Sequence, residues 1–184
     1  MARRVNTKFL TILTCVVLGL LAVAVLASKF LIRESPDKYV NAGNQLLSEK
    51  KYEEAARNFA HAVALDPKNP ALWVQYGDAL NELSAVDPEY LARARQAWES
   101  ALATDASNKP ALDRMMSFWS DMANIYTYRP EIFERLNDTA KRLYAADPKN
   151  AAAEVAIVTS VIRPWLVGVE KDQRLVEDLS LIHI

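Results

Sequence analysis

Residues 36–69 decide the fold, and they read PDKYVNAGNQLLSEKKYEEAARNFAHAVALDPKN. Apolar and small residues recur every three or four positions in the first half, as at Tyr39 and Leu46. They do so again in the second half, as at Ala55 and Phe59, and a short polar stretch separates the two halves. This spacing places one apolar stripe on each of two helices. The stretch therefore predicts two antiparallel helices joined by a turn.

The tetrapeptide that closes this stretch recurs along the chain. The sequence DPKN at residues 66–69 returns unchanged at 147–150, and DASN at 105–108 is a degenerate copy. Pro67 ends a helix, because the residue before a proline is pushed out of the helical conformation. Asn69 is suited to cap the helix that follows. Two helices followed by such a tag, repeated at this period, predict a solenoid of helix pairs.

These residues resemble the tetratricopeptide repeat (TPR) family, whose units are helix pairs of about 34 residues. Residues 36–69 match its pattern without a gap, residues 70–108 contain one insertion, and residues 109–150 contain a longer one. Residues 151–178 supply part of a fourth unit. The resemblance implies an all-α fold, namely a right-handed helical-hairpin solenoid of about three TPR units plus part of a fourth. The first two units carry the match at Tyr39, Ala42, Gly43, Leu46, Ala55, Phe59, Ala62, Pro67, Trp73, Tyr76, Gly77, Leu80, Ala94, Trp98 and Ala101.

Two glycines predict close packing within the helix pairs. We expect Gly43 to face Ala55 and Gly77 to face Ala94, so that the backbones approach while an aromatic ring fills the neighbouring space. No unit can bury its apolar face alone. Stability is therefore expected to come from stacking of successive units.

The third and fourth units depart from the pattern. In residues 109–150 the second helix has large residues where the pattern has small ones. The second helix therefore fits the repeat pattern in two ways, which differ by one helical turn around Ala140, and both stay open. A further helix from Ala151 is expected to end near Ile162, because Pro164 lacks a backbone N–H and disrupts a helix interior.

An uncharged segment precedes the repeats. Residues 9–28 read FLTILTCVVLGLLAVAVLAS, and twenty helical residues span the roughly 30 Å of a hydrocarbon core. We predict a transmembrane signal anchor over residues 9–32 behind a basic head, residues 1–8. A cleaved signal peptide is the alternative, although its apolar core is typically only about 7–15 residues long. The charge distribution predicts a cytoplasmic N-terminus and a body outside, periplasmic in a Gram-negative-type bacterium.

The composition excludes several classes of function. Residues 34–184 hold 17 basic and 23 acidic residues, a net charge of about −6, which disfavours nucleic-acid binding. The four glycines are isolated, so no phosphate-binding loop can be written. One cysteine and two histidines provide neither a metal cluster nor a recognisable catalytic motif. We therefore expect no enzyme activity, cofactor, metal or small-molecule substrate.

The resemblance implies a protein or peptide partner, bound in a concave groove formed by the first helix of each unit. That surface is polar and mildly acidic, so we expect a basic or apolar partner. A subset of TPR domains clamps the terminal carboxylate of chaperone tails. That clamp is not expected here, since Asn44 and Arg114 fit it but Val40, Gln75 and Pro110 do not. The predicted groove residues are Val40, Asn44, Leu47, Val74, Asp78, Asn81, Asp113, Ser117 and Asp121.

The two insertions predict a second candidate surface. Both fall between the helices of their units, so they protrude from the same edge of a solenoid, where insertions often mark a binding face. Exposed tyrosine and arginine side chains are common interface anchors. The alternative is that each insertion only starts a helix and packs its aromatic residues beneath its own loop. The candidate edge residues are Tyr90, Tyr126, Tyr128 and Arg129.

The final residues, 179–184, read LSLIHI and resemble the translated end of a sequencing adapter; a natural terminus is the alternative. On the adapter interpretation the protein continues past Asp178. The sequence as a whole favours a membrane-anchored scaffold or adaptor in envelope complex assembly, similar to anchored repeat proteins of cytochrome c maturation. Two alternatives stay open. The repeats recruit substrate for a larger enzyme, or the chain is a cleaved, soluble periplasmic repeat protein.

Overall fold

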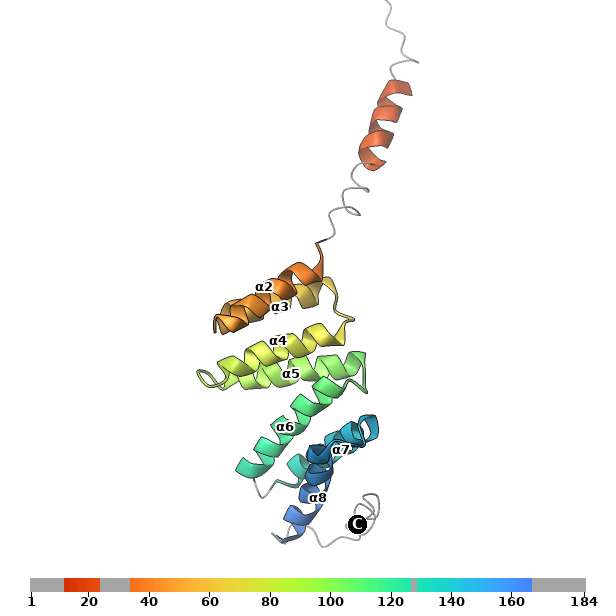
Figure 1. The fold of residues 1–184 in the computed structure, drawn as a ribbon. Coiled ribbons are helices and arrows are strands. Elements are labelled where there is room, and N and C mark those ends of the chain that lie inside the picture. The colour runs from red at the N-terminus through yellow and green to blue at the C-terminus, as the bar shows by residue number, and fades with distance from the viewer. Residues whose placement is uncertain (1–11, 24–33, 127–128, 167–184) are drawn as a thin grey trace, which may run out of the picture. The chain divides into compact units, whose positions relative to one another are not determined.

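The computed structural model describes residues 12–23, 34–126 and 129–166, with the side chain of Trp165 left out. The chain divides into two units, Met1–Ser35 and Pro36–Ile184. Every regular element within the described residues is an α-helix. Figure 1 shows the helices of the second unit stacked as successive pairs. They are α2 (Pro36–Ser48), α3 (Tyr52–Leu65), α4 (Pro70–Leu83), α5 (Glu89–Thr104), α6 (Lys109–Ile125), α7 (Pro130–Ala146) and α8 (Ala151–Leu166).

The repeated tag caps the first helix of the pair that follows it. Its asparagine carboxamide oxygen accepts a hydrogen bond from a backbone N–H in the first turn, which satisfies a donor with no partner inside the helix. The prediction for Asn69 is thus confirmed. The three bonds measure 3.0–3.1 Å and run to Asn69 from Ala71, to Asn108 from Ala111, and to Asn150 from Ala153.

The glycines of α2 and α4 lie against aromatic rings, in agreement with the expectation that a ring fills the space beside each of them. A Cβ atom added to Gly43 would lie 2.8 Å from Cζ of Phe59. One added to Gly77 would lie 2.5 Å from Nε1 of Trp98. Both distances are well below the 3.5–4.0 Å of a comfortable contact. The ring of the second helix therefore sits over the glycine of the first.

The core of the third pair adopts the unshifted register. Leu136, Ala140 and Leu143 are all buried between α6, α7 and α8, whereas Tyr144 is only half-buried. Phe133 is also buried there, although the sequence pattern did not single it out. Large side chains thus fill the space that small residues and one ring occupy in the other pairs.

Helix α8 continues through Pro164 to Leu166, so the expected end near Ile162 is wrong. Proline in a helix interior costs about 3 kcal/mol, because it removes a hydrogen bond and crowds the preceding turn. Tertiary packing offsets this cost. Pro164 is fully buried, and the hydroxyl of Ser160 accepts a hydrogen bond from Nδ2 of Asn137 at 2.8 Å. That bond ties α8 to α7.

The N-terminal unit contains a helix over residues 12–23. Its large apolar side chains are exposed, between 47% and 65% for those from Ile12 to Val23. Within the described residues, no helix combines the length and the apolar character needed to cross a membrane. The remainder of the predicted span, residues 9–11 and 24–32, lies outside the described part of the chain, as do the basic head and residues 167–184.

Substitution of Gly77 by alanine should destabilise the repeats. The new methyl group would displace the Trp98 indole, which is buried and hydrogen-bonded, and the expected loss is about 1–2 kcal/mol after the gain in helix propensity. Urea unfolding followed by far-UV circular dichroism measures it. Gly19→Ala is the matched control, because nothing lies within 4 Å of a Cβ there. A Gly77→Ala protein as stable as the parent would contradict this packing.

Candidate functional site

A groove of about 670 Å³ runs between α6 and α8. Its floor is apolar and well packed, with Met116, Leu136 and Ala156 all buried. Val155 forms an apolar wall of the groove and is 63% exposed. Two of the predicted groove residues, Asp113 and Ser117, line it. The groove therefore lies beside α6 and α8, which are the first helices of their units.

Polar groups mark the two ends of this groove. Asp113 lies in the first turns of α6, and its carboxylate is 3.3 Å from a guanidinium nitrogen of Arg114. Near the last turns of α6 and α8, the guanidinium of Arg163 donates to Oδ1 of Asn124 at 2.7 Å. A middle section that is apolar apart from the hydroxyl groups of Ser117, Ser120 and Thr159 is therefore flanked by a carboxylate at one end and a guanidinium at the other.

Asp78 joins three helices instead of facing a ligand. Its carboxylate on α4 accepts two hydrogen bonds from the Arg114 guanidinium of α6, at 2.9 and 3.2 Å. The indole N–H of Trp98 on α5 donates to the same carboxylate at 3.1 Å. The hydrogen bonds that the Arg114 guanidinium donates to Asp78 raise the pKa of Arg114 further above its usual range. The predicted groove residue Asp78 is thus engaged inside the protein.

The remaining predicted groove residues differ in exposure. Val74 is wrong as a groove residue, because it is buried with Ala101 and Ala111 where α4 packs against the following helices. Val40 and Leu47 are half-buried and pack against the core. The polar positions are exposed on the first helices, namely Asn44, Asn81, Ser117 and Asp121.

Only some of the residues predicted to form the loop edge are exposed to solvent. Tyr126 is 49% exposed and Arg129 is exposed, but Tyr90 is half-buried against the core with the guanidinium of Arg93 5.3 Å from its ring. Tyr128 lies outside the described residues. The sequence did not single out Ile125, which is exposed beside Tyr126. Helix α7 begins at Pro130, which agrees with the interpretation of that insertion as a helix start.

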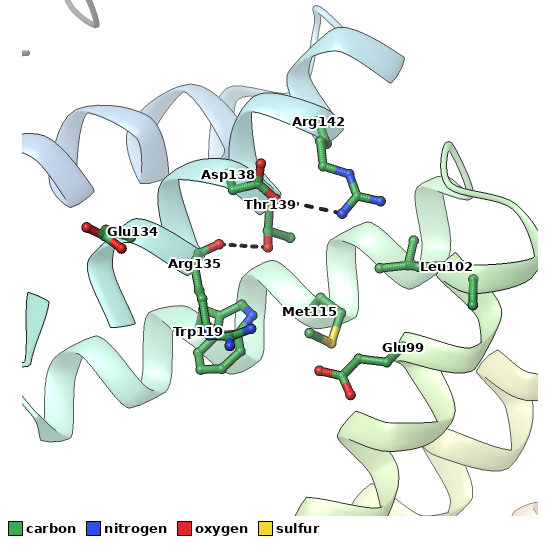
Figure 2. Close-up of a pocket in the computed structure, with 10 residues that line it drawn as sticks. Glu99, Leu102, Met115, Trp119, Glu134, Arg135, Asp138, Thr139 and Arg142 are labelled. Carbon is green, nitrogen blue, oxygen red and sulfur yellow. Dashed lines mark hydrogen bonds and ion pairs between the residues drawn. The ribbon is translucent and has the colours of Figure 1, made fainter. Parts of the chain in front are cut away.

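A second cleft of about 530 Å³ opens between α5 and α7, with α6 as its floor (Figure 2). The guanidinium of Arg135 lies 5.3 Å from the Trp119 ring centroid, a cation–π contact. That of Arg142 donates to the backbone oxygen of Ala106 at 2.9 Å. The guanidinium groups of Arg135 and Arg142 thus both interact with other groups of the protein. Sequence spacing does not predict the cleft, since it arises where α6 leans away from α5 (Figure 1).

Metal chemistry has no visible basis in the part of the chain that the structure describes. No group of three or more histidine, cysteine, aspartate or glutamate side chains comes together there to hold an ion. The carboxylates of the groove instead face guanidinium groups or solvent. The groove offers a ligand an apolar wall at Val155 and a charged group at each end.

No protein family model and no curated protein matches the sequence, but solved structures match the fold. The first TPR domain of Spaghetti (RPAP3) bound to the HSP90 peptide SRMEEVD has a TM-score of 0.55 and 20% identity, covering 68% of this chain and 90% of that one. The Sgt2 TPR domain from Aspergillus fumigatus has a TM-score of 0.55 and 19% identity, covering 74% and 85%. The chain has the TPR fold.

A third similar structure is the second TPR domain of human RPAP3 in complex with the HSP70 peptide SGPTIEEVD. Its TM-score is 0.53 and its identity 17%, and the match covers 68% of this chain and 98% of that one. The two RPAP3 domains are each in complex with a peptide. At such low identity the likeness concerns the arrangement of helices and does not transfer a ligand.

Removing the Asp78 carboxylate should destabilise the repeats. Asp78→Ala leaves the buried Trp98 N–H without an acceptor, which costs about 1–3 kcal/mol. Asp78→Asn keeps an acceptor oxygen but loses the ion pair, and because that pair is partly exposed its loss should cost less than about 1 kcal/mol. Urea unfolding measures both, with the exposed Asp121→Asn as control. Equal stability of the alanine variant and the parent would contradict a joining role for Asp78.

Proposed function

We propose that this chain is a membrane-tethered TPR protein that binds a basic or apolar segment of another protein in the groove between α6 and α8. The observation that carries the proposal is the groove itself, which is lined by the exposed apolar side chain of Val155 and by the carboxylate of Asp113. Burial of an apolar side chain against Val155 would supply affinity. The carboxylate would favour a cationic neighbour.

The charge of the first helices supports a basic partner. Asp78 and Asp113 both lie within hydrogen-bond distance of Arg114, so one guanidinium faces two carboxylates. Asp121 adds an exposed carboxylate further along α6. The relatives in complex with SRMEEVD and SGPTIEEVD hold acidic peptides. Here Asp78 already occupies Arg114, which disfavours a partner of that kind.

The acidic side of the groove can be tested with a peptide. A fluorescein-labelled peptide rich in lysine and leucine should bind the full chain, and Asp113→Asn with Asp121→Asn should weaken it about threefold to tenfold, since each exposed charge contributes up to about 1 kcal/mol. Fluorescence polarisation measures the affinity. Glu131→Gln with Glu134→Gln on α7 is a matched control with the same charge change outside the groove. Unchanged affinity in the aspartate variant would contradict the proposal.

The tether is the second part of the proposal. The exposed apolar surface of the helix over residues 12–23, together with the uncharged sequence from 9 to 28, supports insertion into a bilayer. We propose a cytoplasmic N-terminus and repeats on the outer side, in the periplasm of a Gram-negative-type host. Such a tether confines the groove to the membrane surface and raises the local concentration of partners. Assembly of an envelope complex is the role that this arrangement favours.

Two measurements test the tether. After carbonate extraction the full chain should stay in the membrane pellet, because only an integral segment resists release. An alkaline phosphatase fused after residue 166 should be active, because that enzyme requires export. Release into the supernatant would instead indicate a cleaved signal, and an active cytoplasmic reporter at the same site would contradict the proposed orientation.

A further inference from the structure

We infer that the groove between α6 and α8 selects an extended segment of about five residues, with a basic side chain at one end, apolar side chains in the middle and a carboxylate at the other. The inference rests on the proposed peptide binding and specifies its ligand. It adds the requirement for an acidic end, which the overall negative charge of the chain would not suggest.

The Asp113 end of the groove is acidic. Asp113 is the member of the Asp78–Arg114–Asp113 cluster that lines the groove, and this cluster holds two carboxylates and one guanidinium. Both hydrogen bonds of the Asp78–Arg114 pair measure 2.9–3.2 Å, so the guanidinium is directed at Asp78. A lysine or arginine of a partner would therefore find an excess negative charge at this end.

The Arg163 end of the groove is basic. The guanidinium of Arg163 donates to the amide oxygen of Asn124, which carries no charge. In residues 12–23, 34–126 and 129–166, no carboxylate forms an ion pair with Arg163. An amide holds the guanidinium in place without neutralising it. A guanidinium placed in this way at the end of the groove is the side chain best matched to a carboxylate of a ligand.

Between the two ends the groove carries no charged side chain. Met116 and Ala123 of α6, Leu136 of α7, and Val155 and Ala156 of α8 form most of its floor and walls, with the hydroxyl groups of Ser117, Ser120 and Thr159 among them. A partner's charged side chain placed there would lose water without meeting an opposite charge, which is unfavourable. Apolar side chains are therefore expected in the middle of the ligand.

The length of the groove fixes the spacing of the two charges. Asp113 and Asn124 are eleven residues apart on α6, which corresponds to about 16 Å along the helix axis. An extended chain covers that distance in about five residues. An extended segment of about five residues therefore spans the distance between the two charged ends.

Capped pentapeptides test this selectivity on the full chain in detergent micelles. The probe Lys-Leu-Leu-Leu-Glu is compared with versions that end in glutamine or lysine, by fluorescence polarisation and in both sequence directions. The glutamate peptide should bind about threefold to fivefold more tightly than the glutamine peptide, as expected for one partly exposed charge pair. Arg163→Gln should abolish that preference, Arg163→Lys should retain it, and Arg163→Glu should favour the peptide with two lysines.

The control is Arg135→Gln, which removes the same charge from the second cleft and should leave the preference intact. Equal affinity for the glutamate and glutamine peptides, or a preference that survives Arg163→Gln, would overturn the inference. In both cases binding of the two-lysine peptide would leave the proposed function standing. If none of the peptides bound, the result would contradict both the proposed function and this inference. A dimer in sedimentation velocity that Arg163→Gln dissolves would make a second copy the occupant and would also overturn the inference.

Discussion

The contact between a glycine on one helix and an aromatic ring on the next sets the spacing of the first two helix pairs. Gly43 lies under Phe59, and Gly77 lies under Trp98, at distances that leave no room for a side chain. Both rings belong to one apolar cluster that runs from α3 to α6. The helices can approach only because the glycines are bare, so the stacking of the following elements depends on these two positions.

The third pair lacks this contact, and the structure changes accordingly. Met115 and Met116 are buried on α6, and Phe133 and Leu136 fill the space against α7. Beside this pair a cleft opens between α5 and α7. The carboxylate of Asp78 bridges the junction through Trp98 and Arg114. A modest ion pair thus joins three helices where apolar packing is thinner.

The same arrangement determines the electrostatics of the candidate groove. Arg114 would be available to an acidic partner, but Asp78 engages it. The guanidinium of Arg163 donates to the uncharged amide of Asn124. In each case the local charge depends on the partner within hydrogen-bond distance of the guanidinium, which is a carboxylate for Arg114 and an amide for Arg163. For this reason the sign of the charge at each end of the groove cannot be read from the net charge of the chain.

The helix pairs, their caps and the all-α class follow from local sequence, because periodicity, proline and capping asparagine act over a few residues. Asn69 and its two counterparts begin their helices for local reasons. The burial of Val74, the ion pair of Asp78 with Arg114 and the passage of α8 through Pro164 depend on the packed fold. These features join residues 20 to 40 positions apart, or depend on packing that offsets a local cost. The groove beside Arg163 belongs to this second class, since its two walls come from helices that meet only in the folded solenoid.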